Sequence, residues 1–74
     1  MTFEEFEKKC WEKGYGVAAM NHYVLGGKRF LYCVVFNKKR QSAFQAEAEN
    51  SEEVFENIFN QITQSEKKDE IFYL

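Results

Sequence analysis

Hydrophobic residues follow a helical period near the N-terminus of the chain. Four of them recur at helical spacing between charged positions: Phe3, Phe6, Cys10 and Trp11. This spacing predicts an amphipathic helix with a single apolar stripe. Thr2 and Glu5 are spaced as in a capping box, and Gly14 follows the last turn, so the helix is expected to begin at Thr2 and to end at Gly14.

The middle of the chain has the composition and the shorter period of strands. We predict three strands, over Tyr15 to Leu25, Arg29 to Phe36 and Gln41 to Glu49. Gly26 and Gly27 predict a tight hairpin between the first two, because both residues accept the positive φ of such turns. The second segment is apolar on both faces, which predicts that it is the central strand.

A second helix is predicted after the strands, with Asn50 or Ser51 as its N-cap. Its apolar stripe consists of Val54, Phe55, Ile58, Phe59 and Ile62. Both helices are expected to lie on the same face of a three-stranded antiparallel meander. The predicted fold class is therefore α+β, in the order helix, three strands, helix (αβββα).

The end of the chain has no helical stripe of its own. Residues 65–70 form a charged segment, and an apolar tail follows: Ile71, Phe72, Tyr73 and Leu74. We expect the tail to form a short edge strand or to pack against the sheet. The alternative is that it docks into a partner or into a second copy of the chain.

Length and composition are those of one small folded domain. The chain has 74 residues, of which 45% are hydrophobic and 18% aromatic. We therefore expect a single domain over residues 1–74 with an ordered core of about 2–64. No segment approaches the roughly 18 apolar residues that span a bilayer. No membrane association is expected, and the expected location is the cytoplasm of a bacterial host cell.

Residues that carry chemistry are few. Cys10 and Cys33 are expected to be buried free thiols rather than a disulfide. Together with His22, the one histidine, they are too scattered for a zinc site. No nucleophile, base and oxyanion site can be assembled from the chain. We expect no catalytic residues, no metal and no cofactor, and hence a protein that is not an enzyme.

The net charge is only −2 at pH 7, but the predicted topology separates the charges into two poles. The acidic pole, with the adjoining sheet face, is the predicted partner-binding surface: Gln45, Glu47, Glu49, Glu52, Glu53 and Glu56. The basic pole lies at the helix ends and the second turn: Lys13, Lys38, Lys39, Arg40, Lys67 and Lys68. These cations either complement helix dipoles and aid solubility, or bind phosphate.

The order of elements resembles that of double-stranded-RNA-binding domains. That family binds phosphates through a lysine cluster at the start of its second helix. Here the same position reads Asn50-Ser51-Glu52-Glu53, which would repel phosphate. The resemblance therefore implies the topology and not that contact.

The chain is also similar to small, proline-poor proteins of Firmicutes phages and prophages, among them an anti-CRISPR inhibitor of a CRISPR effector nuclease. The resemblance lies in the helix ending at Lys13-Gly14-Tyr15, the apolar strand Phe30 to Asn37, and the run Ala48 to Glu56. It implies a partner-binding inhibitor. That inhibitor is strongly acidic and similar to a DNA mimic, whereas this chain has balanced charge and a basic turn at Lys38–Arg40, so no individual residue role is carried over.

Three hypotheses for the function follow. The first is a non-enzymatic phage or mobile-element protein that modulates a host protein, such as a defence nuclease, by protein–protein contact. The alternative is a small nucleic-acid-binding module, similar to double-stranded-RNA-binding domains, that uses the Lys38–Arg40 turn with Lys67 and Lys68. A homodimer built by pairing edge strands or exchanging the tail is compatible with either.

Overall fold

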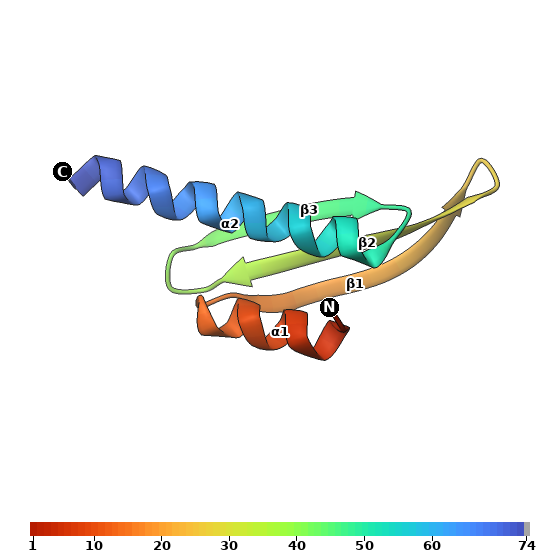
Figure 1. Cartoon of the computed structure of the whole chain (residues 1–74), viewed down its shortest axis with the longest axis horizontal. Coiled ribbons are helices and arrows are strands. Elements are labelled where there is room, and N and C mark those ends of the chain that lie inside the picture. Colours follow the sequence, from red (N-terminus) through yellow and green to blue (C-terminus); the bar gives the residue numbers. More distant parts are fainter. Residues whose placement is uncertain (74) are drawn as a thin grey trace.

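The chain folds as a helix, a three-stranded antiparallel sheet and a second helix (Figure 1). The computed structural model describes the backbone of residues 1–73 and the side chains of residues 1–67. The elements are α1 (Phe3–Glu12), β1 (Gly16–Leu25), β2 (Lys28–Asn37), β3 (Ser42–Ala48) and α2 (Ser51–Tyr73). The predicted αβββα fold is confirmed.

Helix α1 is capped at both ends by local hydrogen bonds. The hydroxyl oxygen of Thr2, the predicted N-cap, accepts a backbone N–H of the first turn at 3.2 Å. At the other end Gly14 has a φ of +90°. Its N–H donates to the carbonyl of Trp11 at 2.9 Å, and the N–H of Tyr15 donates to that of Cys10 at 2.8 Å. These two bonds make a Schellman motif, which ends the helix and leads the chain into β1.

The strand order is β1-β2-β3, so β2 is central, as predicted. Gly26 and Gly27 have φ angles of 61° and 77°, the positive values that a tight two-residue hairpin turn requires. The sequence pattern did not predict the irregularity in β1, where Val17 pairs with Val35 but Ala19 pairs with the adjacent residue of β2. The additional residue is a β-bulge that resets which side chains of β1 face the core.

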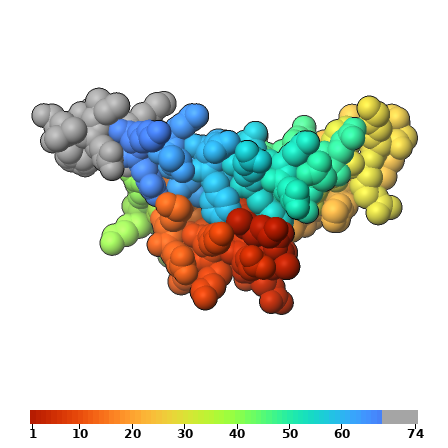
Figure 2. All heavy atoms as spheres, in the orientation of Figure 1, coloured from red at the N-terminus to blue at the C-terminus, as the bar shows by residue number. Residues whose placement is uncertain are grey.

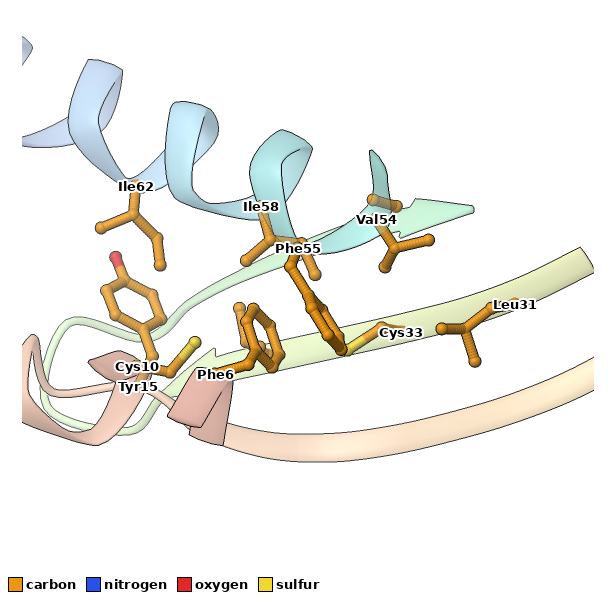
Figure 3. Close-up of a cluster of buried hydrophobic side chains, with 11 residues drawn as sticks. Phe6, Cys10, Tyr15, Leu31, Cys33, Val54, Phe55, Ile58 and Ile62 are labelled. Carbon is orange, nitrogen blue, oxygen red and sulfur yellow. The ribbon is translucent and has the colours of Figure 1, made fainter. Parts of the chain in front are cut away.

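Both helices pack on the same face of the sheet, as predicted (Figure 3). The ring of Phe6 from α1 stacks on Phe55 from α2, with centroids 4.1 Å apart and 16° between the ring planes. Phe59 meets Phe6 edge-on at 5.3 Å. The buried core comprises Phe6, Cys10, Tyr15, Leu31, Cys33, Val35, Ala46, Val54, Phe55, Ile58 and Ile62.

The apolar stripe of α1 is narrower than predicted. Phe6 and Cys10 are fully buried, but Phe3 is 40% exposed and Trp11 is 76% exposed. An α-helix turns by about 100° per residue, so Trp11 lies about 100° around the helix from Cys10. The Trp11 ring therefore leaves the side of α1 that faces the sheet.

Helix α2 is longer than the predicted element. It continues through the charged segment 65–70 to Tyr73, so an edge strand at the end of the chain is wrong. Glu and Lys have good helix propensity, and neither Pro nor Gly interrupts the chain after Gly27. Without a breaker, a helix nucleated on the packed stripe continues past Ile62, the last core residue among the described side chains.

The molecule is elongated, with extents of 48 × 22 × 21 Å. β3 pairs with β2 only from Leu31 onward, so the hairpin tip of β1 and β2 has no third strand. Figure 1 shows this tip reaching beyond the start of α2. The space-filling view shows α1 and α2 side by side, with the tip, in yellow, beyond them (Figure 2).

Candidate binding surfaces

The face of the sheet opposite the helices carries a row of aromatic and aliphatic side chains. Leu31, Cys33 and Val35 of β2 point into the core, so the alternate residues of this strand point away from it. Cross-strand pairing adds residues of β1 and β3 to the same face. We name this surface the open face; it comprises Tyr23, Phe30, Tyr32, Val34, Phe36, Gln45 and Glu47.

Two tyrosine hydroxyls hold the aromatic rings of the open face in place. The hydroxyl of Tyr32 donates to Oε1 of Gln45 at 2.7 Å. The hydroxyl of Tyr23 donates to the carboxylate of Glu47, and this bond raises the pKa of Tyr23. The Tyr23 ring also stacks on Phe30, with centroids 5.4 Å apart. Because Tyr23 is on β1 and Glu47 on β3, the Tyr23 side chain crosses the central strand and lies along the sheet.

The residues of the predicted partner-binding surface fall on both sides of the sheet. Gln45 and Glu47 belong to the open face, and Glu49 follows β3, where its carboxylate lies 3.5 Å from Nζ of Lys28. The remaining three are exposed on α2, which packs on the opposite face: Glu52, Glu53 and Glu56. The structure therefore divides these residues between the two faces of the molecule, and it places Gln45 in the middle of the sheet rather than at the end where the carboxylates gather.

The acidic end also carries cations that the sequence interpretation left out. The β1–β2 turn lies at the same end as the last residue of β3, because the strands are antiparallel. Lys28 and Arg29 follow this turn and are exposed, as are Val24 (64%) and Leu25 (68%) before it. An antiparallel meander puts the first turn and the end of the third strand at the same end of the sheet. The predicted topology could therefore have placed Lys28 and Arg29 beside the acidic residues.

Four of the predicted basic residues line one groove of about 680 Å³ at the other end of the molecule. It lies where the end of α1 meets the start of β1 and the β2–β3 turn. We name it the basic groove; its lining includes Trp11, Glu12, Lys13, Gly16, Phe36, Lys38, Lys39 and Arg40. The sequence interpretation missed Trp11 and Phe36, and the angular position of Trp11 on α1 was the signal for its exposure.

The other predicted basic residues lie on α2. Lys67 is exposed and does not line the groove. Glu66, its neighbour, has Oε1 3.4 Å from Nζ of Lys13, which ties α2 to the end of α1. The side chain of Lys68 lies outside the described residues. The docking predicted for Ile71, Phe72, Tyr73 and Leu74 likewise falls on side chains outside the described residues.

The two cysteines are buried free thiols, as predicted. Burial raises the pKa of Cys33 to about 11. Burial and the neighbouring Cys33 raise the pKa of Cys10 to about 11 as well. Neither thiol is therefore an activated nucleophile at neutral pH. Among the described residues, no group of three or more His, Cys, Asp and Glu side chains is placed to hold a metal ion.

Comparisons with protein families, with curated proteins and with solved structures found no match to this chain. In the described part of the chain, neither helix has the length and apolar character needed to cross a membrane.

The geometry of the described residues offers two surfaces of different chemistry. The open face is aromatic with an acidic border, and the basic groove combines cations with exposed rings.

Proposed function

We propose that this chain is a non-enzymatic binding protein whose open face docks onto a basic surface of a partner protein. The observation that carries the proposal is the row of aromatic side chains on this face, in which the hydroxyls of Tyr23 and Tyr32 are hydrogen-bonded to Glu47 and Gln45 of β3. Both helices pack on the other face of the sheet and leave this row accessible within the described residues. Aromatic residues, tyrosine among them, are enriched in protein interfaces.

The fixed rings favour tight association. Binding loses affinity when mobile side chains must be ordered in the complex. Tyr23 and Tyr32 are already ordered by their hydrogen bonds, and Tyr23 is further restrained by its stacking on Phe30. A partner that covers the open face therefore gains apolar contact area at a low entropic cost.

The charges favour a basic partner. Glu47 lies on the open face, and Glu52 and Glu53 lie in the first turn of α2 at the same end of the molecule. No ion pair is recorded for these three carboxylates among the described residues. They would attract a basic surface and orient it over the open face during encounter.

Proteins that hold nucleic acid present such basic surfaces, because their channels neutralise phosphates. CRISPR nucleases belong to this class of nucleic-acid-binding proteins, and the sequence resembles phage proteins that inhibit them. In its specific form the proposal is that the protein is encoded by a phage or mobile element and inhibits a host defence nuclease.

The test is a DNA-cleavage assay with a purified, guide-loaded CRISPR effector nuclease and increasing amounts of the protein. We expect the wild type to inhibit cleavage. Val34→Arg places a bulky cation in the middle of the open face and should abolish inhibition, and Asn60→Arg, on the exposed side of α2, should not. Simultaneous charge reversal of Glu49, Glu52 and Glu53 should weaken inhibition in a salt-dependent manner.

Two results would contradict the proposal at different levels. Full inhibition by folded Val34→Arg protein would show that the open face is not the contact surface. No inhibition by the wild type would exclude that nuclease as the partner. The binding proposal is then tested by affinity capture from cells with the wild type and with the Val34→Arg variant. It fails if no complex that depends on Val34 can be reconstituted from purified components.

A further inference from the structure

The basic groove adjoins the open face and shares Phe36 with it, but its cationic side chains have no part in the docking proposed for that face. Its lining contains four cationic side chains and one carboxylate, Glu12. Lys13 forms an ion pair with Glu66, with Nζ and Oε1 3.4 Å apart. Among the described residues, neither Lys38 nor Lys39 forms an ion pair. The groove is therefore a locally positive concavity on a chain whose net charge is negative.

Two exposed aromatic rings border the same concavity. Trp11 is 76% exposed and Phe36 is 39% exposed, although large apolar side chains are usually buried. Gly16 is the cross-strand partner of Phe36 and also lines the groove. A Cβ atom on Gly16 would meet nothing within 4 Å, so open space lies above this part of the groove.

The turn that carries the cations is held in one conformation by its own hydrogen bonds. Asn37, which is buried, accepts the backbone N–H of Arg40 through Oδ1 at 3.1 Å. Nε2 of Gln41 donates to the carbonyl of Lys38 at 2.9 Å. A ligand thus meets cations whose backbone positions are already fixed, which lowers the entropic cost of binding.

We infer that the basic groove binds single-stranded nucleic acid, with Trp11 stacking on a base and Lys38 and Lys39 contacting the neighbouring phosphates. Exposed aromatic rings beside a positive groove are the two elements of such sites, and stacking tolerates any base. Duplexes fit this groove poorly, because their bases already stack on one another and leave no free face for Trp11.

Trp11 is the only tryptophan of the chain, so its fluorescence reports contact at the groove directly. The experiment titrates the protein with short oligothymidylate, oligouridylate, a DNA duplex and heparin, which is a polyanion without bases. We expect the single strands to quench Trp11. Heparin and the duplex should leave its emission nearly unchanged. Raising the salt concentration should weaken single-strand binding, with a log–log slope of about −0.7 for each phosphate contacted.

Anisotropy of a labelled single strand then tests the residues. Trp11→Ala should weaken binding roughly tenfold or more, the loss of one base–aromatic stack. Trp11→Phe should recover most of this loss. Lys38→Ala/Lys39→Ala should weaken binding and flatten the salt dependence, whereas Lys9→Ala/Lys28→Ala removes the same charge elsewhere and should do neither.

Several outcomes overturn the inference. Equal quenching of Trp11 by heparin and by single strands would mean that the groove attracts polyanions by charge alone and that Trp11 does not stack on a base. Binding that Trp11→Ala leaves intact in a folded protein would place nucleic acid elsewhere on the molecule. No response to any of the four probes would leave the groove as a surface for contact with proteins. Circular dichroism of each variant confirms that a loss of binding is not a loss of fold.

Discussion

Gly14 and Gly16 lie two residues apart between α1 and β1 but face different constraints. Gly14 has a φ of +90°, and a Cβ atom built on it would lie 3.0 Å from Nδ2 of Asn37. Gly16 has no positive φ, and its Cβ would meet nothing within 4 Å. Only Gly14 therefore requires glycine for both its backbone conformation and its surroundings.

These surroundings predict opposite responses to the same substitution. Gly14→Ala should lower the free energy of unfolding by about 1–3 kcal/mol, because alanine is strained at this φ and crowds Asn37. Gly16→Ala should leave it unchanged or raise it by up to about 1 kcal/mol, since it restricts the unfolded chain. Denaturant unfolding measures both values. Equal effects of the two substitutions would contradict this account of the α1–β1 junction.

The two buried thiols give the stability of the protein a dependence on alkaline pH. Both pKa values are near 11 in the folded protein, against 9.0 for a free thiol. Above pH 9 the unfolded chain releases thiol protons that the folded protein retains, so the unfolded state is favoured progressively. The contribution of the two buried, protonated thiols to the stability of the fold is fully present below pH 9 and is lost as the pH rises toward 11.

The prediction concerns the difference between two proteins, because lysines and tyrosines also titrate in this range. The free energy of unfolding of the wild type should fall more steeply between pH 9 and 11 than that of Cys10→Ala/Cys33→Ala. Thiol-specific labelling at neutral pH should be slow in the folded protein and fast in denaturant. Parallel pH profiles for the two proteins would show that the thiols are not buried as described.

At the scale of elements, the start of α2 depends on one side chain. The sequence left Asn50 and Ser51 as alternative N-caps. In the structure Oδ1 of Asn50 accepts the N–H of Glu53 at 2.9 Å, and its carbonyl accepts the N–H of Val54 at 3.4 Å. Ser51 is the first residue of the helix itself. Asn50 is therefore the cap that satisfies N–H groups of the first turn.

We expect Asn50→Ala to lower the free energy of unfolding by about 1 kcal/mol, the usual effect of losing an N-cap. Asn50→Asp keeps the acceptor oxygen and should restore most of the loss. Ser51→Ala is the matched control and should change stability by less than about 0.5 kcal/mol. Thermal unfolding followed by circular dichroism compares the three variants, and a larger loss for Ser51→Ala than for Asn50→Ala would contradict the assignment.

The elements were predictable because each has its own hydrophobic period and its own end signals. Thr2 predicted the start of α1, Gly14 its end, and the Gly26-Gly27 pair the turn between β1 and β2, each close to its position in the structure. The bulge in β1 was not predictable, because Gly16 and the two alanines after it carry no strong preference for either face. The length of α2 was missed for a related reason: no apolar stripe at helical spacing continues through residues 65–70, and the good helix propensity of Glu and Lys there was not used.

At the scale of the whole molecule, the candidate surfaces were predictable only in part. Charge and topology placed Lys38, Lys39 and Arg40 together with Lys13 from the sequence alone. The open face required the strand register, because only the pairing reveals that Tyr23 reaches across β2 to Glu47. To predict that Trp11 is exposed, one must know how far around α1 the buried stripe extends. Periodicity identified which residues are apolar, but packing decided which of them are covered.

The elongated shape has a consequence for magnetic relaxation. A body of 48 × 22 × 21 Å rotates faster about its long axis than end over end, and α2 runs along that axis (Figure 1). Amide N–H bonds in a helix lie nearly parallel to the helix axis, whereas those of the strands point across the sheet. The α2 amides therefore sense the slow end-over-end rotation and should show higher nitrogen-15 R2/R1 ratios than the strand amides. The difference would reflect the orientation of rigid bonds in an anisotropically tumbling molecule, with no contribution from internal motion.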